Sequence, residues 1–399
     1  MDFQNPRIRL RGGSMAPPPE LNPEIVDEVL VRLPRDDPAG FIRASAVCKS
    51  WLDTLTDPVF LRRYRDLHGT APLVLGFLHD PVDRSLARFV PTTAFRPAVA
   101  ADHSTSVVLD CRHGRALFYD YGSSEFVVWD PITGRERRMR DDVPDSYTNY
   151  TVLCAAGAGC DHSACSDGPF LMASAGVECR DLVQADACVY SSETGVRRGP
   201  DGIYLDFNLE EAYDENCPYY LQSDRPGVLV GGTLYFVCRS SALLRYDVLG
   251  TQGRGSLSVI KLPPGKFPGS STIVMRAENG GLGLATLRRD VLQLWSTETG
   301  PDGDVEWVKM NRIQLRKLMP LNSPARLIGL IEDANVVFVT SDDHGIFTVD
   351  LKSLLTKKVC EMDKVKDVFP YVCYYTPAAG ARGMLLAPVG PQGSSSSHL

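Results

Sequence analysis

The stretch ELNPEIVDEVLVRLPRDDPAGFIRASAVCKSWLDTLTDPVFLRRYRDL, residues 20–67, predicts a cluster of three or four short helices near the start of the chain. Three times within it an Asn or Asp precedes a proline, at Asn22-Pro23, Asp37-Pro38 and Asp57-Pro58. Such a side chain accepts hydrogen bonds from the first turn of a helix, and proline suits the first helical position because it has no amide hydrogen. We therefore expect each of these pairs to begin a helix.

The predicted helices carry more apolar surface than a short segment can bury within itself. In the first helix, Ile25, Val26, Val29, Leu30 and Leu33 recur at the spacing of a single apolar face. The later helices add further apolar residues at helical spacing: Phe41, Ile42, Val47, Cys48, Trp51, Phe60, Leu61, Tyr64 and Leu67. This surplus predicts a small helical module that completes its core on a partner protein.

Three motifs give this module a family resemblance. Leu33-Pro34 follows the first helix, Val47-Cys48-Lys49-Ser50-Trp51 closes the second, and Asp57-Pro58-Val59-Phe60 opens the last. The arrangement resembles an F-box, the motif that docks on a Skp-family adaptor of a cullin-RING ubiquitin ligase. The start departs from the family pattern, since Leu21-Asn22-Pro23-Glu24 moves the proline by one place. The alternative is an ordinary three-helix cap packed on the downstream domain.

The resemblance implies an adaptor-binding surface on the module, with no catalytic residue and no cofactor. We expect the interface and its immediate support at Leu21, Ile25, Leu30, Leu33, Pro34, Val47, Cys48 and Trp51. The implied partners are a Skp-family adaptor and, through it, a cullin-RING ubiquitin ligase.

Composition bounds the class of protein. The 399 residues are 44% apolar and 23% charged, as in an ordinary soluble globular protein. The net charge of −7 argues against nucleic acid as the main partner, because a duplex-binding surface needs an excess of basic residues. No apolar run approaches the ~20 residues of a membrane span. The eleven cysteines are odd in number and scattered, which favours reduced thiols in the cytoplasm or nucleus.

After Gly69 the pattern changes from helical spacing to short apolar runs separated by turn residues. An aromatic or β-branched residue followed by a polar turn recurs about every 50–60 residues. The repeats are Trp129–Gly134, Tyr190–Gly195, Tyr246–Gly250, Trp295–Gly300 and a weaker Val349–Ser353. Apolar hairpins precede most of them, for example Val107–Leu109 with Ala116–Tyr119. Short strands repeated at this period predict a β-propeller of about six blades.

The overall prediction is therefore a multidomain α plus all-β chain. We expect a disordered segment at 1–19, the F-box module at 20–67, the propeller at 71–390 and a disordered tail at 391–399. Leu73–Val90 would form the first blade, and Tyr371–Tyr375 or Met384–Leu386 would supply the strand that closes the ring. This half is similar to the kelch-like and F-box-associated β domains common behind F-boxes in plants. The alternative is a β-sandwich.

No catalytic motif is present, and we expect no enzyme activity. A propeller enzyme would need convergent polar groups in its central channel, and the sequence locates none. Cys160, His162 and Cys165, with Cys154 and Cys179 nearby, have the character of soft metal ligands. They lack the paired C-x₂-C spacing of a zinc site, so we predict no metal.

The stretch Gly199–Asp224 carries seven acidic residues and no Lys or Arg, with tyrosines interleaved. Aromatic residues ringed by one sign of charge favour recognition of a basic protein surface. We expect substrate binding at Tyr213, Glu215, Tyr219 and Tyr220. The alternative is a solvated insertion that only packs its tyrosines.

These features predict the substrate receptor of a Skp–cullin–F-box ubiquitin ligase, in which the propeller holds the protein to be ubiquitinated. Two other functions remain open. The chain could serve a non-ligase F-box complex as a propeller-based interaction module, or it could be a propeller enzyme with a helical prefix.

Overall fold

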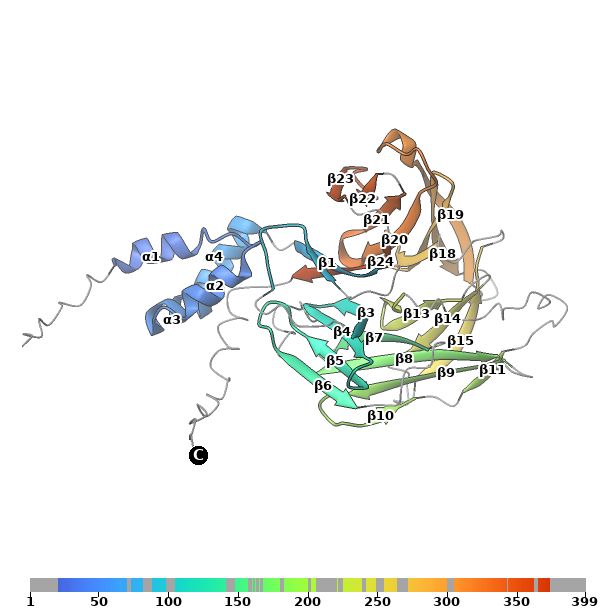
Figure 1. Cartoon of the computed structure of the whole chain (residues 1–399), viewed down its shortest axis with the longest axis horizontal. Coiled ribbons are helices and arrows are strands. Elements are labelled where there is room, and N and C mark those ends of the chain that lie inside the picture. Colours follow the sequence, from blue (N-terminus) through green and yellow to red (C-terminus); the bar gives the residue numbers. More distant parts are fainter. Residues whose placement is uncertain are drawn as a thin grey trace, which may run out of the picture.

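The protein consists of an N-terminal helical module followed by a six-bladed β-propeller (Figure 1). This computed structural model describes residues 21–69, 73–81, 88–97, 105–140, 148–156, 160, 162, 165, 168–179, 183–199, 202–205, 221, 225–238, 242–248, 255–263, 272–299, 305–342, 344–361 and 365–373. The predicted α plus all-β fold is confirmed, and the sandwich alternative is excluded. The two predicted disordered ends, 1–19 and 391–399, lie outside the described residues.

Four helices form the module: α1 (Pro23–Leu30), α2 (Pro38–Ser45), α3 (Lys49–Thr56) and α4 (Pro58–His68). The three capping pairs begin α1, α2 and α4, as predicted. Asn22 accepts a hydrogen bond from the Glu24 amide at 2.9 Å, and Asp57 accepts one from Val59 at 2.6 Å. Helix α3 begins without a side-chain cap. These local bonds satisfy amides that the helix itself leaves unbonded.

The module has a small core of its own. Its buried members are Val26, Leu30, Val31, Phe41, Ala44, Leu55, Phe60 and Tyr64. The rings of Phe41 and Tyr64 meet edge to face at 5.2 Å between centroids, and the Tyr64 hydroxyl donates to the Leu33 carbonyl at 3.0 Å. Burial raises the pKa of Tyr64 above its usual value. Helix α4 is therefore held by packing against α2 and by a hydrogen bond to the turn that follows α1.

Five blades are built from consecutive antiparallel strands, each blade starting at its innermost strand. The first is β3 (Ser106–Arg112), β4 (Arg115–Asp120), β5 (Glu125–Trp129) and β6 (Glu136–Arg140). The second is β7 (Thr148–Cys154), β8 (Phe170–Cys179), β9 (Val183–Ser191) and β10 (Arg197–Arg198), with β11 (Ile203–Leu205) also paired to β9. The described residues between 141 and 227 thus contribute one blade.

The next three blades follow the same pattern. They are β12 (Val228–Val230), β13 (Thr233–Val237), β14 (Ala242–Asp247) and β15 (Ser256–Lys261); β16 (Thr272–Arg276), β17 (Leu282–Arg288), β18 (Val291–Thr299) and β19 (Val305–Gln314); and β20 (Arg326–Ile331), β21 (Val336–Ser341), β22 (Gly345–Asp350) and β23 (Thr356–Cys360). Short 3₁₀ turns, η4 (Leu315–Lys317) and η5 (Glu332–Ala334), follow β19 and β20. Apolar clusters between neighbouring blades form the core.

The sixth blade closes the ring with strands from both ends of the domain. Its order is β2 (Arg88–Pro91), β1 (Leu73–Pro81) and β24 (Val365–Cys373), with Leu73 opposite Cys373 and Leu78 opposite Phe369. The predicted first-blade segment is therefore part of the closing blade. Strand β24 begins earlier than the predicted closing strand Tyr371–Tyr375, and Met384–Leu386 lies outside the described residues.

At three of the repeated turns, a side-chain oxygen at the start of the turn accepts a hydrogen bond from a backbone amide two or three residues later. Asp130 Oδ1 accepts the Ile132 amide at 2.9 Å, and Asp350 Oδ1 accepts the Ser353 amide at 2.8 Å. Ser191 Oγ accepts the amide three residues on at 3.4 Å. The fourth residue beyond each adopts a positive φ, between 60° and 73°. The Trp295–Gly300 repeat differs, because residues 295–299 continue strand β18.

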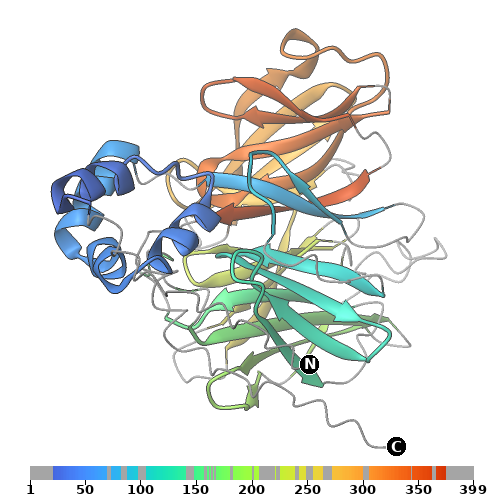
Figure 2. The same cartoon turned by 60° about the vertical axis from the view of Figure 1, so that its left-hand side comes forward.

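The helical module packs directly on the closing blade (Figure 2). Ile42 of α2 contacts an apolar cluster of the propeller formed by Leu75, Phe95, Ile132, Tyr371 and Cys373. Only residues 70–72 separate the end of the module from the start of β1. No helix in the described part of the chain is long and apolar enough to cross a membrane.

Candidate functional site

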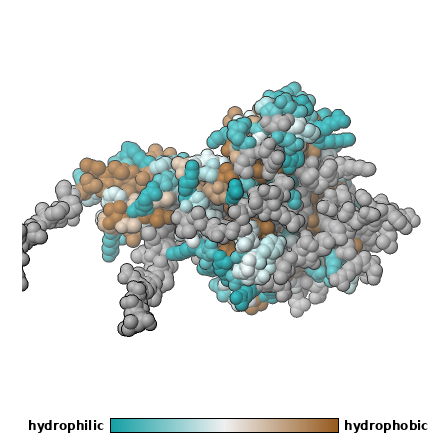
Figure 3. All heavy atoms as spheres, viewed as in Figure 1, coloured by the Kyte–Doolittle hydropathy of each residue, from teal (hydrophilic) through white to brown (hydrophobic). Residues whose placement is uncertain are grey.

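Exposed apolar side chains gather on the helical module. Among the described residues, thirteen large hydrophobic side chains are exposed, and six of them belong to residues 21–69: Leu21, Ile25, Val29, Val47, Val59 and Leu67. Figure 3 shows apolar surface concentrated on this module, at the end away from the propeller. A packed module that leaves this much apolar surface in water has the character of a docking surface.

Helix α1 has two apolar faces rather than the single face that the sequence predicted. Val26 and Leu30 point into the module core and are 7% and 1% exposed. Ile25 and Val29 remain 56% and 55% exposed, and Leu21, one turn earlier, is 63% exposed. Residues adjacent in sequence lie about 100° apart around a helix, so two neighbouring i, i+4 pairs serve different surfaces.

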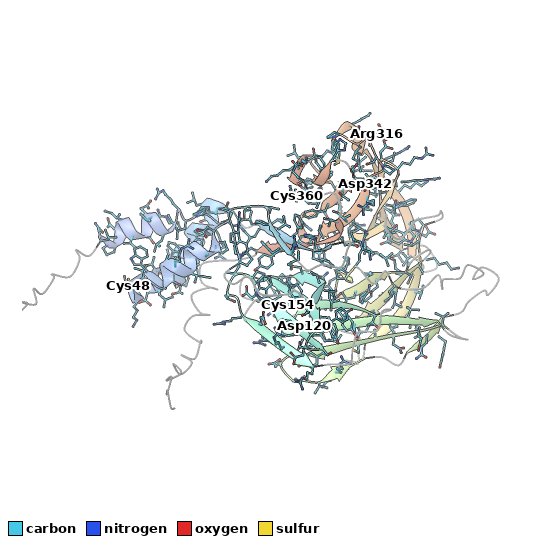
Figure 4. The ribbon with its side chains drawn as sticks, viewed as in Figure 1. Cys48, Asp120, Cys154, Arg316, Asp342 and Cys360 are labelled. Carbon is cyan, nitrogen blue, oxygen red and sulfur yellow. The ribbon has the colours of Figure 1, made fainter. Side chains whose placement is uncertain are left out.

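The remaining predicted interface residues divide in the same way. Val47 and Cys48, in the turn between α2 and α3, are exposed, and so is Pro34. Leu33 and Trp51 are half-buried against the module core. Figure 4 shows Cys48 at the end of the module farthest from the propeller. The predicted set therefore contains outward-facing residues and residues that support them from within.

Charged side chains fix the relation of α1 to α4. Arg63 forms ion pairs with Asp27, at 2.5 Å, and with Glu28. Arg32 also pairs with Glu28, one turn along. All of these side chains are at least a third exposed, so the pairs contribute little stability, about 0–1 kcal/mol each. Their role is to hold α1 in one orientation beneath its exposed apolar face.

The propeller axis contains the second candidate site, a cavity of about 100 Å³ among the inner strands β3, β12, β16, β20 and β24. Its lining includes five charged residues: Asp110, Arg112, Arg225, Glu332 and Asp367. The sequence located no convergent polar groups for the channel, and the structure now places these five there. Asp110 and Arg112 share β3, but the other three come from distant parts of the chain, which is why their meeting could not be read from local sequence patterns.

Most of these charges are used in contacts between blades. Arg112 forms an ion pair with Glu332 and donates to the Gly227 carbonyl at 2.8 Å. Arg225 pairs with Asp367 at 3.0 Å and donates to the carbonyl of Thr272 at 2.8 Å. A carboxylate–guanidinium pair that also binds backbone carbonyls is well placed to hold inner strands together.

The fifth charged group, Asp110, is enclosed. It accepts the amides of Val152 and Cys111, both at 2.8 Å. Burial raises the pKa of the Asp110 carboxyl, an effect that Arg112 partly opposes. Because its two oxygens are already bonded to backbone amides of β3 and β7, this carboxyl joins two blades.

Comparison with known families assigns both halves of the chain. Residues 19–63 match the F-box domain, and residues 107–378 match the family described as "F-box protein AT5G49610-like, beta-propeller". The chain belongs to this family. Membership confirms the F-box and the propeller behind it, while the kelch-like resemblance remains an expectation. The AT5G49610-like family combines the two parts that recognition subunits use, and such domains are typical of non-enzymatic adaptor proteins.

Solved structures similar to this AT5G49610-like F-box protein are distant. AztD from Citrobacter koseri is 9% identical, with a TM-score of 0.37, over 76% of this chain and 85% of that one. The Cps50 (Swd1) β-propeller domain of Myceliophteria thermophila is 12% identical, with a TM-score of 0.37, over 65% and 88%. Sqt1 from Saccharomyces cerevisiae is 11% identical, with a TM-score of 0.35, over 65% and 63%. No curated protein matches the chain.

The predicted substrate-binding residues lie outside the described part of this F-box protein. Tyr213, Glu215, Tyr219 and Tyr220 fall within residues 206–220. Of the surrounding stretch, Leu221 is described: it is 3% exposed and pairs with Cys238 on the third blade. The acidic stretch therefore stays a prediction from sequence.

The structure also brings together four of the five residues that the sequence analysis considered as soft ligands, without Cys179. Cys154, Cys160, His162 and Cys165 place one ligand atom each within 4.8 Å of one another. The spacing C-x₅-C-x-H-x₂-C contains no C-x₂-C pair, which is why the sequence predicted no metal. A pattern of four soft ligands within twelve residues was the usable signal.

Proposed function

We propose that this F-box protein is the substrate-recognition subunit of a Skp–cullin–F-box ubiquitin ligase. The observation that carries the proposal is the exposed face of α1, where Leu21, Ile25 and Val29 stay in water although the module already has a packed core. An amphipathic helix with a second, unburied apolar stripe fits docking against a partner's hydrophobic surface. The F-box match supports a Skp-family adaptor as that partner.

The protein's role in such a complex is proximity rather than chemistry. The adaptor binds the module, the propeller binds the substrate, and substrate lysines are held at high effective concentration near the ubiquitin-loaded enzyme. Loops on a rigid propeller are suited to substrate recognition, and the acidic, tyrosine-rich stretch 199–224 is our candidate for it. The expected location is the cytoplasm or nucleus, and no nucleic acid or membrane partner is expected.

The test is reconstitution with full-length protein. Purified chain is mixed with a Skp-family adaptor, a cullin and its RING subunit, and the complex is isolated by size-exclusion chromatography. We expect a stoichiometric complex that contains all four proteins and that, with ubiquitin-charged enzyme, ubiquitinates a bound protein. Absence of adaptor binding by folded protein would overturn the proposal.

A second function, a non-ligase F-box complex, is distinguished by the same experiment. In that case the adaptor would be recovered with the chain, but the cullin would be excluded from the assembly. An enzyme function receives less support from the channel, because its charged groups are occupied by contacts between blades. Arg112 and Arg225 are each bonded both to a carboxylate and to a backbone carbonyl.

A further inference from the structure

Three thiols and an imidazole converge in the connection between β7 and β8. The Cys165 Sγ lies 3.1 Å from the Sγ of Cys154 and 3.1 Å from that of Cys160. His162 Nδ1 lies 3.4 Å from the same sulfur. Cys165 is buried, whereas the other three side chains are half-buried. All four ligand atoms are therefore grouped around a single point, from one short segment of chain.

These distances suit a shared metal ion. Zinc–sulfur bonds of ~2.3 Å and a tetrahedral angle place two thiolate sulfurs ~3.8 Å apart, with a thiolate and an imidazole slightly closer. The separations here, from 3.1 Å up to 4.8 Å, lie on both sides of that value. A disulfide, with its bond of ~2.05 Å, could use only two of the three thiols. It would leave the third thiol and His162 grouped without a reason.

Groups behind the cluster complete a second layer of support. The Ala156 amide donates to Cys154 Sγ at 3.3 Å, a bond that stabilises a thiolate. The Arg115 guanidinium, 2% exposed, donates to the carbonyls of Cys165 and Gly168 and lies 5.5 Å from the Phe170 ring centroid. Such contacts fix the loop that carries the ligands and hold their positions.

The charge of Arg115 strengthens the argument. In the described part of the chain no carboxylate lies within ion-pair distance of this buried cation, and the buried Asp130 attracts it from farther away. Burying an uncompensated charge is costly. Three thiolates and one divalent cation together carry a net charge of minus one, which Arg115 would balance.

We propose that Cys154, Cys160, His162 and Cys165 bind one Zn²⁺, which fixes the β7–β8 connection of the second blade. A tetrahedral set of three sulfurs and one nitrogen is a closed structural site, with no position left for a reacting molecule. Figure 4 shows Cys154 on the propeller, separate from the helical module. The zinc would thus stabilise a propeller loop and take no part in adaptor docking.

The test measures metal content of the full-length chain. Protein is purified with reductant and without chelator, and zinc is counted by mass spectrometry of the metal. We expect about one zinc per chain. Cys160→Ser should weaken zinc affinity by more than about tenfold in a competition titration with a chromogenic chelator. The matched control is Cys188→Ser, because Cys188 lies in the same blade, bonded to Ser174 at 3.0 Å, and should keep full zinc content.

Two further measurements keep the test decisive if a variant folds poorly. Replacing zinc by Co²⁺ in the wild-type chain should give the visible absorption of a tetrahedral thiolate site, and His162→Cys should retain metal with a shifted spectrum. A chelator should lower the melting temperature of the wild type but not that of Cys160→Ser. The proposal fails if wild-type protein carries less than about a tenth of a zinc per chain and takes up none. It also fails if reductant-purified protein contains a disulfide among these cysteines.

Discussion

Truncating the exposed face of α1 should weaken adaptor binding about 30-fold without unfolding the module. The perturbation is the double variant Ile25→Ala with Val29→Ala, two side chains that are 56% and 55% exposed on one face of the helix. Alanine is the best helix former, so the helix itself should keep its stability. The same residues contribute little to the module core, which the adjacent face of the helix contacts through Val26 and Leu30.

The magnitude follows from the number of carbons removed and the exposed fraction still available to a partner. Burial of each methylene contributes about 0.8 kcal/mol, and the two substitutions together remove roughly five carbons. A little over half of the surface of these side chains is in water and therefore available for burial by a partner. The loss is therefore about 2 kcal/mol of binding free energy, which corresponds to about a 30-fold rise in Kd. Interface cavities would increase the loss further.

The assay is calorimetry or surface plasmon resonance against a purified Skp-family adaptor, with the melting temperature measured on the same samples. Two controls separate interface from fold. Leu30→Ala, at a side chain 1% exposed, should cost about 2–5 kcal/mol of folding free energy and lower the melting temperature. Leu355→Ala, 73% exposed on the propeller, should change neither quantity. An unchanged Kd for a folded Ile25/Val29 double variant would refute the assignment of this face.

Three other predictions test the propeller. Arg225→Met should destabilise the fold by about 3–5 kcal/mol in denaturant titration, because it leaves Asp367 buried without its cation, whereas Arg316→Met, which breaks an exposed pair, should cost less than about 1 kcal/mol. Amide bonds, the one from Ser353 foremost, hold the pKa of Asp350 below its usual 3.8. The stabilisation by the Asp350 carboxylate is therefore complete above about pH 3.8 and is lost as the pH falls through its lowered pKa. Asp350→Ala should then cost about 1 kcal/mol of folding free energy near neutrality and less at about pH 3. An equal cost at both pH values would contradict this reasoning. Neutralising four acidic residues of stretch 199–224 to Asn or Gln should slow substrate association and remove most of its salt dependence; these are Glu210, Glu211, Asp214 and Glu215. If these changes leave association unchanged, while variants of the tyrosines lower stability, the stretch is structural.

The parts of the fold that sequence analysis predicted depend on contacts between near neighbours in the chain. The Asn-Pro and Asp-Pro pairs begin helices because the capping oxygen and the amide that it binds are only two or three residues apart. The repeated turns identified blades because Asp130 and Asp350 bind amides within three residues. Where the repeat did not form that turn, at residues 295–299, the pattern was real but its interpretation as a turn was wrong.

Features that depend on distant contacts were not predictable from one sequence. The sequence predicted a closing strand near Tyr371 but not that it pairs with β1, a strand separated from β24 by almost the whole domain. The channel charges meet across blades, as Arg112 with Glu332 does. The face of α1 that turns outward also depends on tertiary packing, since Ile25 and Val26 are equally apolar. The residues expected at the adaptor interface and its support therefore include both Leu30, which is buried, and Ile25, which is exposed.

The firmness of the junction between the helical module and the propeller determines how precisely a bound substrate would be held relative to the ligase. A flexible tether spreads a bound substrate over a wide volume and lowers its effective concentration near the ligase's catalytic end. Here the module is joined to β1 through residues 70–72, and Ile42 packs into a propeller cluster that includes Tyr371 and Cys373 of the closing strand. The same β24 therefore closes the ring and supports the module. A substrate held by the propeller would keep a defined position relative to the adaptor surface on α1, which is the arrangement that a proximity mechanism requires.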